Sequence, residues 1–237
     1  MKASYLGACY LALFSSVLCA EVTIIGTDIP GLHQQDGKGV YDVIVNQTLV
    51  SKGLGALKVL PPARAEAEFK SCQNCCFSPA NKNPEFYDFG GDVSVSEPMN
   101  VAKVYIFSAP GKRPFSSYAD LKGKKVGVRR GMIYGNSFDA ANLKASEANS
   151  LEQNIKKLET GRIDAMVAYV PDAYLALSGM GKGEFPHTKD QPTAIHNDAL
   201  VCRGVPAGFL DQFNQNLKAL SSSGKLNSIL GDSYVAP

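Results

Sequence analysis

The sequence predicts an α/β protein with two lobes, each a mostly parallel sheet flanked by helices, joined by two hinge strands. Three observations predict it. Short apolar runs alternate with amphipathic stretches, an Asn-, Pro- and Gly-rich segment interrupts this alternation once near residues 81–100, and the alternation then resumes. Strands that alternate with helices form parallel sheets. A chain of 237 residues is long enough for two lobes of about 100 residues each.

The first twenty residues, MKASYLGACYLALFSSVLCA, have the pattern of a cleaved secretory signal peptide. One lysine precedes an apolar run that is shorter than the roughly 20 residues a membrane span needs. Cys19 raises the alternative of a lipid anchor, although Leu18 stands where a lipoprotein signal has a small residue. We expect a soluble mature chain that begins near Glu21 and is exported to the periplasm.

The first half of the mature chain is predicted as strand, helix, strand, helix, strand. A Gly stop ends the first helix, and a proline in the first turn begins the second. The five segments are, in order, EVTIIGTD, YDVIVNQTLVSKGLG, ALKVLP, PARAEAEFKS and CCFSPAN.

The second half repeats the alternation after the linker and an apolar hinge strand, VAKVYIFSAP. In NSLEQNIKKLETG, Ser150 and Gln153 form a capping box and Gly161 ends the helix. The other predicted segments are a short helix in SSYADLKG, strands in KKVGVRR, RIDAMVAYV and DALVCRG, and helices in PDAYLALSG and PAGFLDQFNQNLKALSSSGKLNSILG. We expect one lobe at 21–107 with 196–237 and the other at 108–195.

Four cysteines remain after the signal: Cys72, Cys75, Cys76 and Cys202. Export to an oxidising compartment favours a structural disulfide over a redox or metal centre, and no second Cys/His pair completes a zinc site. Cys72 could pair with Cys75 or with Cys76. The two remaining thiols can pair with each other if the strand that holds Cys202 lies beside CCFSPA.

Charge and motifs exclude several classes of function. The net charge of +2 is too small to demand a polyanionic partner, so no nucleic acid is expected. The sequence has no Gly-x-Ser-x-Gly elbow, no HExxH and no Gly-rich loop followed by Lys-Ser/Thr, which predicts neither an enzyme nor a cofactor nor a metal. The acid pairs Asp36/Asp42 and Glu66/Glu68 are interpreted as solvated surface.

The loop VRRGMIYGNSFD follows a predicted strand and enters a helix. Free N–H groups at such a turn, with Arg129 or Arg130, bind a carboxylate or phosphate. Because strand side chains alternate, at most one of the two arginines should face a ligand, and each could equally face solvent. In a two-lobed α/β protein that ligand is expected between the lobes, at the carboxyl ends of the strands.

The order of these motifs resembles the extracellular solute-binding proteins of family 3, the type II periplasmic binding proteins that serve ABC importers for polar amino acids. DLKGKKVGVRRG resembles the strand that enters the second lobe, and LETGRIDAMVAY the helix, strand and cleft loop that follow. ALVCRGVPAGFLDQFNQNLKALSSSGKLNSIL resembles the return strand and closing helices. The resemblance implies two lobes that close on a solute.

Two departures from the family pattern concern the ligand. Phe86 in NPEF stands where relatives have the arginine that holds an α-carboxylate, and Tyr169 stands where they have the aspartate that pairs with the amino group. A buried charge without a partner is unfavourable. An ordinary α-amino acid is therefore not the expected ligand.

Ten residues are candidates for ligand binding in place of those anchors. Each has an alternative as a turn, packing or surface residue. They are Asp28, His33, Arg64, Asn81, Lys82, Arg129, Arg130, Gly131, Tyr134 and Tyr169.

We expect a monomeric, non-enzymatic protein that captures a small polar, anionic solute for the membrane permease of an ABC importer. Two alternatives stay open: a ligand-sensing module of the same fold that signals to a membrane partner, and a dehydratase built on this fold. No acid/base pair can be placed in the cleft from the sequence, which disfavours the dehydratase.

Overall fold

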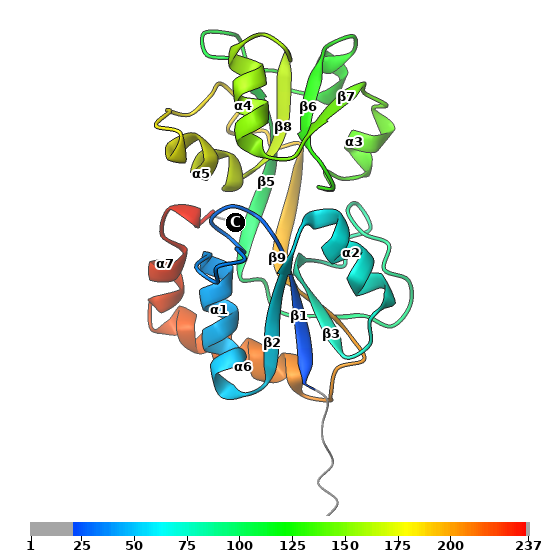
Figure 1. Cartoon of the computed structure of the whole chain (residues 1–237), viewed down its shortest axis with the longest axis vertical. Helices are drawn as coiled ribbons and strands as arrows, with labels where there is room; N and C mark the ends of the chain where they lie inside the picture. Colours follow the sequence, from blue (N-terminus) through cyan, green and yellow to red (C-terminus); the bar gives the residue numbers. More distant parts are fainter. Residues whose placement is uncertain (1–20, 236–237) are drawn as a thin grey trace, which may run out of the picture.

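The computed structural model describes residues 21–235, which form two lobes joined by two long strands (Figure 1). The predicted signal peptide lies outside the described residues. The strands are β1 (Val22–Thr27), β2 (Gly55–Leu60), β3 (Cys75–Ala80), β4 (Ser94–Val95), β5 (Asn100–Ser108), β6 (Val126–Arg129), β7 (Ala145–Ala148), β8 (Ala165–Val170) and β9 (Ala194–Arg203). The α-helices are α1 (Val40–Thr48), α2 (Pro62–Ser71), α3 (Asn136–Ala140), α4 (Leu151–Glu159), α5 (Asp172–Gly179), α6 (Phe209–Ser222) and α7 (Lys225–Leu230).

One sheet path runs through both lobes in the order β2-β1-β3-β9-β5-β8-β6-β7, and β4 also pairs with β9. β1 is parallel to β2 and β3, and β6 is parallel to β7 and β8. β5 and β9 are antiparallel to each other and to their outer neighbours β8 and β3. The structure thus confirms the mostly parallel sheets and the two hinge strands, which cross between the lobes in Figure 1.

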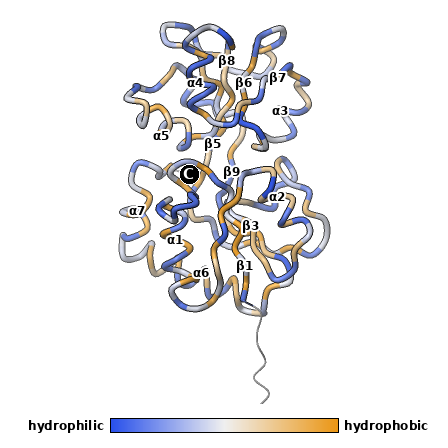
Figure 2. Tube along the Cα trace, viewed as in Figure 1, coloured by the Kyte–Doolittle hydropathy of each residue, from blue (hydrophilic) through white to orange (hydrophobic). Residues whose placement is uncertain are grey.

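Helices cover both faces of each half of the sheet. In the lower lobe of Figure 1, α1, α6 and α7 lie on one side and α2 on the other. Figure 2 shows apolar residues along the central strands and hydrophilic residues at the outer loops. No helix within residues 21–235 is long and apolar enough to cross a membrane.

Local sequence explains the best-predicted helix, α4. Leu151, Ile155 and Leu158 are buried on one face. The Ser150 hydroxyl accepts a hydrogen bond from the backbone N–H of Gln153, as predicted. The Gln153 side chain accepts its bond from Asn149 N–H, one residue earlier than a capping box requires.

Two strands were not predicted, β4 and β7. All residues of β4, and all but the last of β7, are exposed. Edge strands of this kind lack the apolar alternation that identifies a half-buried strand.

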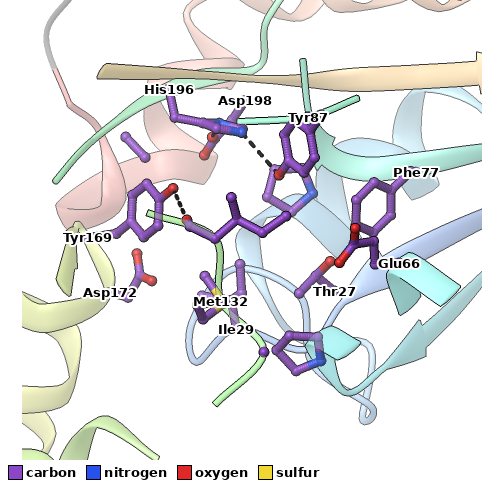
Figure 3. Close-up of a pocket in the computed structure, with 15 residues that line it drawn as sticks. Thr27, Ile29, Glu66, Phe77, Tyr87, Met132, Tyr169, Asp172, His196 and Asp198 are labelled. Atoms are coloured by element: carbon purple, nitrogen blue, oxygen red, sulfur yellow. Dashed lines mark hydrogen bonds and ion pairs between the residues drawn. The ribbon is translucent and has the colours of Figure 1, made fainter. Parts of the chain in front are cut away.

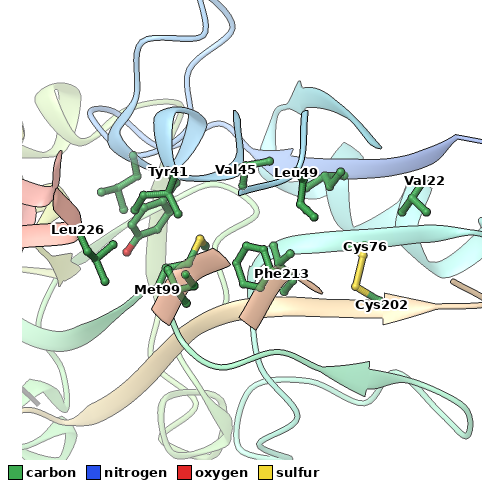
Figure 4. Close-up of a cluster of buried hydrophobic side chains, with 14 of the residues drawn as sticks. Val22, Tyr41, Val45, Leu49, Cys76, Met99, Cys202, Phe213 and Leu226 are labelled. Atoms are coloured by element: carbon green, nitrogen blue, oxygen red, sulfur yellow. A yellow bond between two sulfur atoms is a disulfide. The ribbon is translucent and has the colours of Figure 1, made fainter. Parts of the chain in front are cut away.

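The largest core cluster lies between α1, α6, α7 and the sheet (Figure 4). Tyr41, Leu49 and Phe213 are fully buried in it. At its edge, Cys76 of β3 and Cys202 of β9 face each other in register and form a disulfide. A second disulfide joins Cys72, after α2, to Cys75 of β3. Both pairs are among those the sequence allowed.

Candidate functional site

A cavity of about 40 Å³ lies between the two lobes, beside the hinge strands. This volume admits only a few water molecules, whereas ligand pockets usually enclose roughly 300 Å³ or more. The wall includes Thr27, Ile29, Glu66, Phe77, Tyr87, Gly131, Met132, Tyr169, Asp172, His196 and Asp198 (Figure 3). The lobes are therefore closed on a space that side chains nearly fill.

Direct contacts hold the two lobes in this closed arrangement. Nη2 of Arg129, at the end of β6, donates to the backbone oxygen of Asp28, after β1, at 2.8 Å. At the start of α3, Asn136 N–H donates to the Glu85 backbone oxygen at 2.7 Å, and Ser137 N–H donates to the Glu85 carboxylate at 2.9 Å.

A hydrogen-bonded chain runs along the inner face of β9. Alternation along the strand brings His196 and Asp198 to the same side. Nδ1 of His196 lies 2.7 Å from one Asp198 oxygen, and the hydroxyl of Tyr41 donates to the other. Nε2 of His196 lies 3.2 Å from the Tyr87 hydroxyl (Figure 3). Asp198 is therefore a buried carboxylate with two partners.

Asp172, the first residue of α5, is a buried carboxylate without such partners. Its side chain is in the cavity wall and the residue is 3% exposed. Within residues 21–235, the hydrogen bond to this carboxylate comes from its own backbone N–H. Burial and, to a smaller extent, the charge of Asp198 raise the pKa of Asp172 to about 7. The hydrogen bond from the backbone N–H of Asp172 and the positive charge of Arg129 oppose this rise in the pKa. Asp172 is thus poised to change charge near neutral pH.

The charged side chains of the wall are acidic. Glu66, Asp172 and Asp198 contribute carboxylates, and no lysine or arginine among the described residues lines the cavity. The anionic solute expected from the sequence would meet no cationic counter-charge in this wall. No group of three or more His, Cys, Asp or Glu side chains in residues 21–235 is placed to hold a metal ion.

Two of the ten predicted ligand residues, Gly131 and Tyr169, line the cavity. The Tyr169 hydroxyl donates to the Ile133 backbone oxygen at 2.5 Å. Tyr134 stacks on the Tyr169 ring at 5.7 Å between centroids and accepts a hydrogen bond from Arg129 N–H. Tyr134 thus supports the wall from behind.

The structure separates the two adjacent arginines. Arg129 is 8% exposed and reaches the Asp28 backbone oxygen; its Nη1 is buried without a hydrogen-bond partner in residues 21–235. Arg130 points outward and pairs with Glu147 at 2.9 Å. Arg129 is therefore the arginine that faces the other lobe, although it is not part of the cavity wall.

The remaining candidates lie elsewhere. His33 is fully buried, where Nδ1 contacts Asp42 at 2.7 Å and Nε2 contacts the Ser78 hydroxyl at 2.8 Å. Arg64 is exposed on α2. Asn81 and Lys82 line a separate surface hollow beside β4. None of these four side chains belongs to the cavity wall.

Several wall residues were missed at the sequence level. The interpretation of the acid pairs as solvated surface is wrong for Asp42, which is buried, and for Glu66, which lines the cavity. Asp172 follows Tyr169 by three residues, so an acid does stand near the place where the family pattern has one. His196 and Asp198 also lie in the cavity wall, a pair that could not be placed there from the sequence.

The fold matches solved structures over most of the chain. The GluR0 ligand-binding core from Nostoc punctiforme in complex with L-glutamate superposes with a TM-score of 0.71 at 17% identity, covering 90% of this chain and 99% of that one. A histidine kinase sensor domain with similarity to periplasmic binding proteins superposes with a TM-score of 0.69 at 15% identity, covering 90% of this chain and 96% of that one. The substrate-binding protein of an amino acid ABC transporter superposes with a TM-score of 0.66 at 19% identity, covering 90% of this chain and 98% of that one.

These similarities establish the fold, a two-lobed type II periplasmic-binding-protein architecture. No family model matches the sequence, and no curated protein matches it.

Proposed function

We propose that the chain is an exported solute-binding protein that captures a small polar solute between its lobes. The observation that carries this proposal is the closed interlobe cavity, lined from both lobes and from hinge strand β9. In this proposal residues 21–107 with 196–237 form one lobe and residues 108–195 the other. The solute bridges them and stabilises the closed form.

The proposed partner is the membrane permease of an ABC importer, and the proposed site of action is the periplasm. The N-terminal signal pattern supports export, and a binding protein of an amino acid ABC transporter shares the fold. An α-amino acid held by the usual pair of charges is disfavoured, because Phe86 packs against His196, with ring centroids 4.8 Å apart, where an arginine would be expected.

A second candidate is a sensing module that passes closure on to a membrane partner. The shared fold with a histidine kinase sensor domain favours it. Co-purification from membranes that contain a permease or a sensor kinase would distinguish the two candidates.

Thermal melting of the mature chain with a broad panel of amines, acids, amino acids, peptides and sugars tests solute capture. A solute at 100 times its dissociation constant should add about 2.7 kcal/mol of stability. The solute should be recovered unchanged after incubation, because no turnover is proposed. A panel without any shift would contradict solute capture, and a chemically altered solute would favour the dehydratase alternative.

A further inference from the structure

The cavity wall combines carboxylates with aromatic rings. Glu66, Asp172 and Asp198 supply the charges, and Phe77, Tyr87, Tyr169 and His196 supply rings (Figure 3). Rings of Phe and Tyr attract a cation through their negative faces, and carboxylates attract it directly. Both kinds of side chain therefore favour a positively charged group in the cavity.

The three carboxylates differ in whether a nearby side chain already pairs with them. Glu66 forms an ion pair with Lys70 at 2.7 Å, and Asp198 contacts His196 and Tyr41. Asp172 has no such partner within residues 21–235, and it is almost completely buried. A buried carboxylate needs a hydrogen-bonding cation or a proton to offset its desolvation. Asp172 is therefore the carboxylate in the wall for which a ligand would supply the missing partner.

The nearest guanidinium does not fill that role. Arg129 is outside the wall, and its Nη2 is engaged by the Asp28 carbonyl of the other lobe. No ion pair of 4.0 Å or less joins it to Asp172. Arg129 opposes the rise in the pKa of Asp172 but forms no ion pair with it, so the carboxylate faces the cavity without a direct cationic contact.

On the basis of the proposed function, we infer that the solute is a small organic cation whose ammonium or guanidinium group binds Asp172 and lies against the rings of Tyr169 and Tyr87. The solute carries no α-carboxylate, because the wall has no cationic group for it. The small cavity volume limits its size, and the flexible Met132 side chain can move to admit it.

Matched probes on one carbon skeleton test this inference by isothermal titration calorimetry at pH 7.5. One set is agmatine, L-arginine and 5-guanidinopentanoate; a second is histamine, L-histidine and imidazole-propionate. In at least one set the amine without a carboxylate should bind at least 10-fold more tightly than the other two members. Asp172→Asn should weaken that amine at least 10-fold, whereas Asp211→Asn, an exposed aspartate on α6, should leave it unchanged.

Four outcomes would overturn the inference. Tighter binding of an amino acid or acid than of its amine would reject the cation and leave solute capture intact. If Ca²⁺ or Mg²⁺ binds and none of the amines does, an organic cation as the solute is rejected. Undiminished amine binding by Asp172→Asn would reject the assigned residue. If no compound of any class binds, both the inference and the proposed function fail.

Discussion

Asp172 shows how much of a site can depend on one backbone position. It follows Pro171 at the start of α5, so the fold carries its short side chain into the space between the lobes. Burial raises its pKa to about 7 against an ordinary value of 3.8. The folded protein therefore binds more protons at this site than the unfolded chain does between about pH 4 and pH 7.

We predict that the free energy of unfolding falls as pH rises through that window and levels off above it, once Asp172 is ionised in both states. Asp198 and Arg129 also act on this carboxylate. Asp172→Asn should be more stable than the wild type at pH 8 by roughly 2 to 4 kcal/mol, since one pKa unit corresponds to about 1.4 kcal/mol. At pH 4 the two should be nearly equal.

Urea unfolding from pH 4 to pH 8 measures this difference, with the exposed Asp211→Asn as the control. An Asp172→Asn profile parallel to that of the wild type would contradict the prediction.

The elements show which features the sequence could predict. α4 has its serine cap, its apolar stripe and its glycine stop within the twelve residues from Ser150 to Gly161, so local patterns identified it. β7 and β4 could not be found in this way, because they are short edge strands whose pairing comes from distant residues. Likewise, the strand predicted in DALVCRG begins at Asp198 and leaves out His196; only the crossing of β9 between the lobes brings both residues to the cavity.

The two disulfides should differ in their effect on stability. Cys76 and Cys202 are 126 residues apart in the sequence, and Cys72 and Cys75 only three. A crosslink that closes a long loop restricts the unfolded chain more. Replacing Cys76 and Cys202 by Ala should lower the free energy of unfolding by about 5 kcal/mol, and replacing Cys72 and Cys75 by about 2 kcal/mol.

Urea titration of the two double variants, which serve as controls for each other, checks this ordering. The unreduced, denatured wild-type chain starting at Glu21 should show no free thiol. Equal losses of stability in the two variants would contradict the loop-length argument.

For the molecule as a whole, the two lobes approach each other closely at glycines. A Cβ atom on Gly131 would lie 2.9 Å from the backbone nitrogen of Ala63 in α2, across the cleft. Backbone atoms cannot move away as a flexible side chain can. The closed arrangement therefore requires glycine at this position, where the sequence predicted a ligand-binding turn rather than a contact between the lobes.

We predict that Gly131→Ala holds the lobes apart. Its radius of gyration in small-angle X-ray scattering should exceed that of the wild type, and binding of any captured solute should weaken. Gly111→Ala is a matched control, because Gly111 has nearly the same backbone φ, +76° against +74°, but has no atom within 4 Å of the added methyl group. Equal radii for all three proteins would contradict a closed wild type.

The tyrosines around the cavity also make the protein suited to spectroscopy. The sequence contains ten tyrosines and no tryptophan. Tyr87 and Tyr169 are in the wall, Tyr134 stacks on the Tyr169 ring, and the Tyr41 hydroxyl donates a hydrogen bond to Asp198. Tyrosine fluorescence, which tryptophan would otherwise obscure, therefore reports on the surroundings of the cavity without any attached dye.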